Sequence, residues 1–167
     1  MLRQKIRCRE ISGTDIDAVA DLLRRGFVGR SREYWMQGLR RQAVREVPEG
    51  YPRFGYMLDN DGLAVGVLLL LYTSRSDGNE TAIHCNLSSW YVEPAFRNYA
   101  PLLTKIAQRN KEVTYLNISP ATWTWPIIEM QGFNSYCSGL LFSIPALSRL
   151  TPGMTVEIIS QIGRAHV

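Results

Sequence analysis

The chain has 167 residues, of which 46% are hydrophobic and 20% are charged, and it carries a formal net charge of +4. This length suffices for one globular domain with a full core, and the mild positive charge lacks the dense Lys and Arg patterning of a nucleic-acid-binding protein. The longest apolar run, Leu63 to Tyr72, is too short to cross a bilayer, and no hydrophobic signal segment follows Met1. We therefore expect a cytoplasmic protein with no membrane span and no nucleic-acid partner.

The first part of the chain predicts a strand followed by two helices. Alternation favours a strand over Ile6–Ile11, and Thr14 is the expected N-cap of a helix because Asp17 follows it at the spacing of a capping box. A second helix is expected over Arg32–Val44. The apolar residues of the first helix recur at helical spacing, at Ile16, Val19, Ala20, Leu23 and Phe27.

Three strands should follow these helices. Phe54–Leu58 and Leu63–Tyr72 flank the sequence Asp59-Asn60-Asp61-Gly62, whose composition favours a tight reversal, so the two segments should pair as a hairpin. Thr73–Glu80 is expected to be a polar turn that leads antiparallel into a strand over Thr81–Val92.

The strand that ends at Val92 runs into a loop that opens a helix. This loop, Glu93–Pro101, carries Arg97, and Pro101 fits the first helical turn, where its missing N–H would have no partner. Free N–H groups and the positive end of a helix dipole suit an anion such as a pyrophosphate, and Arg97 adds a cationic fork. Any strand–loop–helix unit has such a turn, so a purely structural role stays open.

The remaining segments complete the order β-α-α-β-β-β-α-β-α-β. A strand is expected over Val113–Ile118, a short helix ends at Gly132-Phe133, and a last strand covers Tyr136–Ile144. Trp123 and Trp125 lie before that helix, where they either line a pocket or cover the edge of the sheet.

The positions of the cysteines and of His84 argue against a disulfide bond, a metal site and a cysteine nucleophile. Cys8, Cys85 and Cys137 are widely spaced in strand-like apolar segments, so we interpret them as reduced core residues. His84 directly precedes Cys85, and neighbours on a strand point to opposite faces. We therefore expect neither a metal site nor a Cys–His pair.

The joints between these elements resemble those of the GNAT acyltransferase family, whose members transfer an acyl group from a coenzyme A (CoA) thioester to an amine. The run Val92-Glu93-Pro94-Ala95-Phe96-Arg97 is similar to the family's Val-x-Pro-x-Tyr-Arg, Asp61–Gly66 to the entry into its third strand, and Glu129–Phe133 to its terminal helix and Gly-Phe. The resemblance implies an α/β (α+β) fold with a mixed, mostly antiparallel central sheet flanked by helices. It places the acyltransferase domain at residues 1–147, and we expect 148–167 to be a tail that is truncated or not native.

The resemblance also implies a site for acetyl-CoA or another acyl-CoA, with no metal. In the family a bulged fourth strand offers main-chain groups to the pantetheine arm and the thioester, which here are those of Trp90, Tyr91 and Val92. Two departures are evident, because the following loop lacks the family's glycines and Ile128 replaces the tyrosine that often protonates the leaving thiolate. The pyrophosphate site maps to Arg97, Asn98, Tyr99, Ala100, Pro101 and Leu102.

Three polar residues share one face of the same strand and are the candidate catalytic residues: His84, Asn86 and Ser88. His84 is either a base, since imidazole exchanges protons near neutral pH, or a structural residue satisfied by a carbonyl or by solvent. Seven arginines lie between Arg24 and Arg45, together with Tyr34 and Trp35. They would suit an acidic or carbohydrate-like small-molecule amine acceptor, although a solvated helix face is the simpler explanation.

The sequence therefore favours an acyl-CoA-dependent N-acyltransferase, and an N-acetyltransferase in particular, that works by direct attack of the amine. The alternative is a non-catalytic acyl-CoA-binding or protein-interaction module on the same scaffold. The oligomeric state is left open, with a homodimer as one alternative.

Overall fold

The computed structural model describes residues 6–77 and 80–137. The chain divides into two compact units, residues 1–122 and 123–167. In chain order the helices and strands are β1 (Ile6–Glu10), α1 (Ile16–Gly26), α2 (Arg32–Val44), β2 (Gly55–Asn60), β3 (Leu63–Asp77), β4 (Glu80–Val92), α3 (Ala100–Ala107), β5 (Val113–Leu116) and α4 (Trp125–Met130), with 3-10 helices at Gly13–Asp15, Pro94–Tyr99 and Thr122–Thr124.

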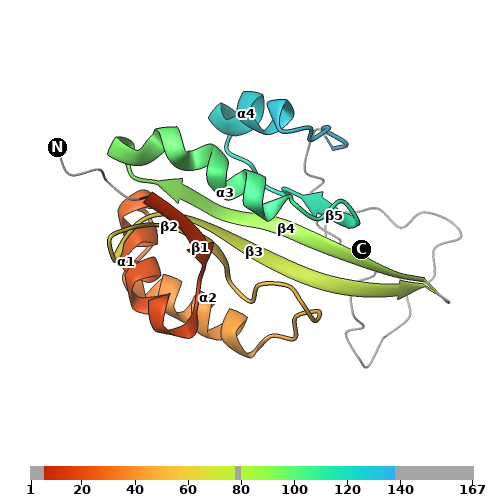
Figure 1. Cartoon of the computed structure of the whole chain (residues 1–167), viewed down its shortest axis with the longest axis horizontal. Coiled ribbons are helices and arrows are strands. Elements are labelled where there is room, and N and C mark those ends of the chain that lie inside the picture. Colours follow the sequence, from red (N-terminus) through yellow and green to blue (C-terminus); the bar gives the residue numbers. More distant parts are fainter. Residues whose placement is uncertain (1–5, 78–79, 138–167) are drawn as a thin grey trace, which may run out of the picture. The chain divides into compact units, whose positions relative to one another are not determined.

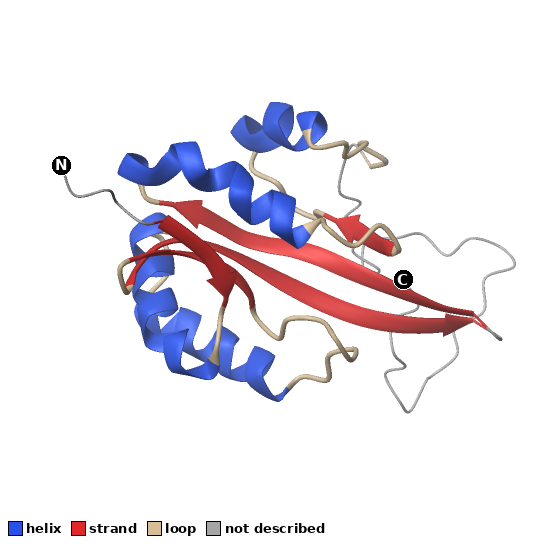
Figure 2. Ribbon diagram, viewed as in Figure 1, coloured by secondary structure: helices blue, strands red, loops and turns tan. Residues whose placement is uncertain are grey.

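The described residues of the first unit form a five-stranded sheet in the order β1-β2-β3-β4-β5. Neighbouring strands are antiparallel except β4 and β5, which are parallel (Figure 1). Helices α1 and α2 cover one face of the sheet, and α3 covers the other (Figure 2). The expected mixed, mostly antiparallel sheet flanked by helices is therefore confirmed.

Apolar side chains from α1 and α2 pack on the sheet because each helix repeats them at helical spacing. Burial of each such side chain contributes about 1.5–3 kcal/mol relative to leaving it exposed. A buried amide fixes α2 further, since Gln42 Nε2 donates to the carbonyls of Arg53, Phe54 and Leu70 at 3.0, 3.3 and 2.8 Å. The core on this face includes Val19, Leu22 and Leu23 of α1, Met36 and Leu39 of α2, and Met57, Val67 and Leu69 of the sheet.

The hairpin between β2 and β3 forms as expected. Asn60 pairs with Leu63, which leaves Asp61 and Gly62 as a two-residue turn with φ of 52° and 91°. Positive φ at both positions is the conformation that joins twisted strands tightly. The Asp59 carboxylate supports the turn by accepting from the Gly62 N–H at 2.7 Å.

Two local expectations are wrong. Ser12 rather than Thr14 begins the first helical segment, because its N–H donates to the Asp15 carboxylate at 2.8 Å and a 3-10 turn precedes α1. The residues expected as a polar turn, Thr73–Glu80, belong to strands as far as Asp77 and again from Glu80. Main-chain hydrogen bonds between β3 and β4 do not depend on side-chain polarity. The polar composition therefore did not indicate where these strands end.

The cysteines and the C-terminal elements fulfil the expectations in part. Cys8 is half-buried and Cys85 is buried, but Cys137 is exposed and is therefore not a core residue. Helix α4 ends as expected at Gly132, which has a φ of 90° and donates to the Glu129 carbonyl at 2.9 Å. Tyr136 and Cys137 are not in a strand, and the rest of the expected strand to Ile144 lies outside the described residues, as does the tail 148–167.

Candidate functional site

Strand β4 carries a bulge near its C-terminal end. Ser88 pairs with Leu69 and Trp90 pairs with Leu68, so Ser89 between them has no partner on β3. Ser89 has a φ of 45°, a left-handed conformation that costs a residue other than glycine free energy. Bulges re-aim main-chain groups and often lie beside functional sites. The bulged fourth strand expected from the sequence is therefore present.

Beyond the bulge, β4 has a neighbouring strand on one side only among the residues that the structure describes. Its parallel pairing with β5 ends at Asn86, opposite Leu116, whereas β4 continues to Val92. The main-chain groups of residues 87–92 that point away from β3 thus have no strand partner among the described residues. Such an edge can bind an extended ligand as if the ligand were another strand. This segment contains the expected pantetheine contacts, Trp90, Tyr91 and Val92.

The end of β4 is fixed against α1 by a close approach. A Cβ atom on Gly26 would lie 2.3 Å from the Tyr91 ring, so only glycine allows this ring to pack on the last turn of α1. The Tyr91 ring also lies 6.4 Å from the Phe27 ring, measured between centroids. One residue past the strand, Glu93 forms an ion pair with Arg25 at 2.8 Å. These contacts position the main chain just after the bulge.

The loop expected to bind a pyrophosphate is helical. Pro94–Tyr99 forms a 3-10 helix that continues into α3, and the Ala100 N–H donates to the Arg97 carbonyl. Ala100 has a φ of −53°, and no residue from 93 to 102 has a positive φ. The missing glycines are therefore not required by this backbone path. The same hydrogen bonding leaves fewer free N–H groups for an anion than an open glycine-rich loop offers.

The side chains of this loop lie at the surface. Arg97 is exposed and has no ion-pair partner among the described residues, so its guanidinium is available to an anionic ligand. Ala100 is half-buried, and the remaining expected members of the pyrophosphate site are exposed, namely Asn98, Tyr99, Pro101 and Leu102.

The three candidate catalytic residues do share one face of β4, but they are not gathered at one point. A strand rises about 3.3 Å per residue, so His84 lies about 13 Å along β4 from Ser88. Asn86 lies between them, and its Oδ1 atom is buried without a hydrogen-bond partner. Ser88 lines a cavity.

That cavity lies between α2 and the bulge of β4, and we call it the α2 cavity. Its volume of about 400 Å³ is in the range of small-molecule sites. The sheet contributes Leu69, Leu71, Ser88 and Ser89. Helix α2 contributes mainly Tyr34, Trp35, Gln37, Arg41, Gln42 and the adjacent Arg45.

The structure separates the seven arginines of this region by their partners. Arg41 and Arg45 line the α2 cavity, and neither has an ion-pair partner among the described residues. Arg24 is exposed. The other four are engaged elsewhere: Arg25 with Glu93, Arg32 with Asp17 and Asp21, Arg40 with Glu33, and Arg30 over the Tyr34 ring at 4.8 Å.

Comparison with known proteins identifies this architecture. No family model matches the sequence, and no curated protein matches it. The solved structure of aminoglycoside N-acetyltransferase AAC(6')-Iy in complex with CoA matches with a TM-score of 0.65 at 15% identity, over 87% of this chain and 99% of that one. A GNAT family acetyltransferase from Staphylococcus aureus matches with a TM-score of 0.55 at 12% identity, over 83% and 98% of the two chains. This chain has the GNAT fold.

A further solved structure supports the same assignment. AAC(6')-IG from Acinetobacter haemolyticus, an aminoglycoside 6'-N-acetyltransferase, matches with a TM-score of 0.59 at 17% identity, over 83% of this chain and 97% of that one. At such identities the likeness establishes the GNAT fold, whereas the residues of the site must be judged from their own geometry.

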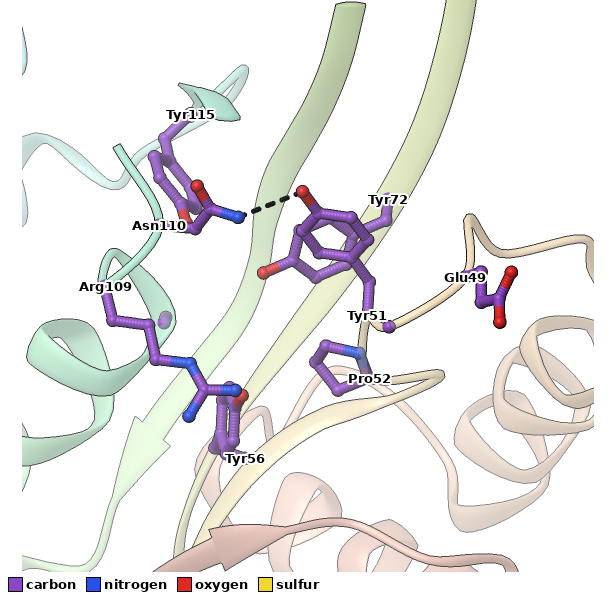
Figure 3. Close-up of a pocket in the computed structure, with 10 residues that line it drawn as sticks. Glu49, Tyr51, Pro52, Tyr56, Tyr72, Arg109, Asn110 and Tyr115 are labelled. Atoms are coloured by element: carbon purple, nitrogen blue, oxygen red, sulfur yellow. Dashed lines mark hydrogen bonds between the residues drawn. The ribbon is translucent and has the colours of Figure 1, made fainter. Parts of the chain in front are cut away.

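A second cavity lies on the other face of the GNAT sheet, and we call it the tyrosine cavity. Its volume is about 230 Å³. Asn110 Nδ2 donates to the Tyr51 hydroxyl at 3.0 Å, and the Tyr51 and Tyr72 rings lie 4.7 Å apart (Figure 3). Burial raises the pKa of Tyr72 above its ordinary value, which keeps this phenol neutral. Tyr56, Tyr115 and Arg109 complete most of the lining.

Sequence reasoning found some of these positions and missed others. It did not predict the tyrosine cavity, because its residues come from distant segments with no common pattern. It noted the arginines in and around α2 but did not separate Arg41 and Arg45 from the others. Their spacing of four residues was the available signal.

Residues 6–77 and 80–137 contain neither a metal cluster nor a candidate membrane helix. No three His, Cys, Asp or Glu side chains in these ranges are placed to share a metal ion. No helix there is both long and apolar enough to cross a bilayer.

Proposed function

We propose that this protein is an acyl-CoA-dependent N-acyltransferase, specifically an N-acetyltransferase that acts on a small-molecule amine. The observation that supports this most is the bulge of β4 beside a main-chain edge that has no second strand within residues 6–77 and 80–137, in a fold shared with solved acetyltransferases. AAC(6')-Iy was solved with CoA and with the bisubstrate analogue CoA-S-monomethyl-acetylneamine.

In the proposed reaction, the amine nitrogen attacks the thioester carbonyl carbon and loses a proton, while the carbon–sulfur bond breaks and CoA leaves as its thiolate. The main-chain N–H groups after the bulge that no described strand pairs with would hold the pantetheine arm and polarise the thioester carbonyl. Arg97 would bind the pyrophosphate as a cation at the start of α3. The Ser88 and Ser89 hydroxyls lie 3.3 Å apart where the α2 cavity meets the bulge, so the amine would enter there.

The cofactor site is tested by titrating CoA into the protein in a calorimeter. Arg97→Ala should weaken binding by about 1.5–3 kcal/mol, because a charge-assisted hydrogen bond to the pyrophosphate is lost. Arg7→Ala is the matched control, since Arg7 is an exposed arginine on β1, separated from β4 by β2 and β3. Equal dissociation constants for the wild type and Arg97→Ala would refute the role of Arg97.

His84 remains a candidate base that needs its own test. Its distance from the bulge means that it would reach the amine only through intervening water. If it is the base, His84→Ala should slow turnover by roughly 10²-fold without changing CoA affinity. Unchanged turnover in this variant would make His84 structural and leave deprotonation of the amine to water.

A non-catalytic acyl-CoA-binding module is the second candidate. The helical path of residues 94–107 and the apolar Ile128 favour it, because they weaken the pyrophosphate site and remove the family's usual acid. CoA binding without transfer to any amine would support this alternative. The cytoplasmic location, the homodimer and the lack of a nucleic-acid partner stay predictions.

A further inference from the structure

We propose that the acceptor amine carries an anionic group, a carboxylate or a phosphate, which Arg41 and Arg45 bind in the α2 cavity. This inference rests on the proposed function and specifies its acceptor. It differs from the aminoglycosides named for the similar enzymes AAC(6')-Iy and AAC(6')-IG, which are cationic amines.

Arg41 and Arg45 are placed to act together. Arg41 lies in the last turn of α2, and Arg45, four residues further on, is the C-cap residue directly after the helix. Arg41 is exposed and Arg45 is half-buried, and both line the cavity. Two guanidinium groups on one wall can donate paired hydrogen bonds to a carboxylate or a phosphate.

The charge of the cavity is one-sided. Among the described residues, its lining contains these two arginines and no Asp or Glu. The acidic residues of the neighbouring helical surface are already engaged, since Asp17 and Asp21 pair with Arg32 and Glu33 pairs with Arg40. A polycationic acceptor would therefore meet unbalanced positive charge, whereas an anionic group would neutralise it.

The charged and hydroxyl groups of the cavity come from two different elements. Arg41 lies on α2 and Arg45 directly follows it, whereas the Ser88 and Ser89 hydroxyls belong to the bulge of β4. Trp35 lies on the same wall as the arginines, and its Nε1–H is buried without a hydrogen-bond partner. A small molecule with an amine at one end and an anionic group at the other would match this arrangement, with the amine directed to the bulge.

The test compares matched acceptors under steady-state conditions with acetyl-CoA, following the loss of thioester absorbance. The pairs are amino acids against their carboxamides, and phosphoethanolamine against ethanolamine, with neamine as the cationic probe. We expect kcat/KM at least about tenfold higher for the anionic member of one pair, and the preferred pair distinguishes a carboxylate from a phosphate.

Variants then assign the preference to the two arginines. Arg41→Gln with Arg45→Gln should raise KM for the anionic acceptor at least about tenfold and leave kcat within about twofold, because binding rather than chemistry is lost. Arg40→Gln is the matched control, since Arg40 is on the same helix but does not line the cavity.

Three results would overturn the inference while CoA binding stays intact. These are equal or better use of the neutral and cationic probes, an unchanged KM in the double variant, and no calorimetric binding of any anionic probe in the presence of CoA. Failure of the wild type to bind CoA would instead refute the proposed function.

Discussion

Gly26 shows how a single missing side chain shapes the candidate site. The absence of a Cβ atom lets the Tyr91 ring lie on the last turn of α1, directly after the bulge of β4. The Tyr91 ring is in turn part of the packing around Phe27 and Trp35. The position of the main chain expected to bind the thioester thus depends on a residue with no polar chemistry of its own.

Gly26→Ala should destabilise the protein by about 1–3 kcal/mol, because the new methyl group overlaps a ring that has little room to move. Gly38→Ala is the matched control, because Gly38 lies within α2 and a Cβ atom there would meet nothing within 4 Å beyond its own helix backbone.

The control should instead stabilise the protein by up to about 1 kcal/mol, since alanine favours the helix. Urea denaturation of both variants measures the difference. Equal stability of Gly26→Ala and the wild type would show that the Tyr91 ring is not held against α1.

At the scale of elements, the turn from β4 into α3 is the main departure from a glycine-rich anion loop. Residues 94–107 follow a helical path without positive φ. Alanine and proline are compatible with this path, so the lost glycines change how an anion is bound without straining the backbone.

Ala100→Gly should therefore leave CoA affinity unchanged and lower the free energy of unfolding by about 0.5–1 kcal/mol, because glycine weakens the first turn of α3. Calorimetric titration and thermal unfolding measure the two effects. Tighter CoA binding in this variant would mean that the loop needs a positive φ when the ligand is bound.

The sequence predicted those elements whose conformation is set by neighbouring residues, and it missed those that depend on contacts between distant segments. The Asp61-Gly62 turn and the bounds of α2 follow from local turn and capping chemistry, and both were predicted. The bulge at Ser89 depends on the register between β3 and β4, so the resemblance indicated a bulge but no local pattern gave its position. The roles of Arg41 and Arg45 depend on which helix face meets a cavity, which required the folded chain.

At the scale of the whole molecule, Arg9 links strand β1 to the helical turn that follows it and to the neighbouring strand β2. It donates to both Asp15 carboxylate oxygens at 2.8 Å and to Asp59 at 2.9 Å. The hydrogen bonds from Arg9, together with those from Ser12, hold the pKa of Asp15 well below its ordinary value. An aspartate with a lower pKa in the folded state stabilises that state at neutral pH, and the stabilisation is lost as the pH falls below about 4.

Asp15→Asn should lower stability at neutral pH and make the further loss on acidification shallower than in the wild type. Asp17→Asn is the control, because Asp17 pairs with Arg32 at the surface, where an ion pair contributes little. Chemical denaturation at a series of pH values compares the two. Parallel curves for the wild type and Asp15→Asn would contradict this account.

The proposed domain boundary is also a prediction at this scale. If the acyltransferase domain ends at residue 147, a chain without residues 148–167 should keep the CoA affinity and melting temperature of the full chain. A loss of either would place part of the tail within the domain.

Hydrogen exchange with and without acetyl-CoA tests the central claim most directly. Slower exchange reports which amides the ligand covers or stabilises. We predict that acetyl-CoA protects the amides of residues 88–92, 97–100 and 102, while those of β1 at the other edge of the sheet change little. Binding that protects a different surface, or no binding at all, would contradict the assignment of the β4 edge as an acyl-CoA site.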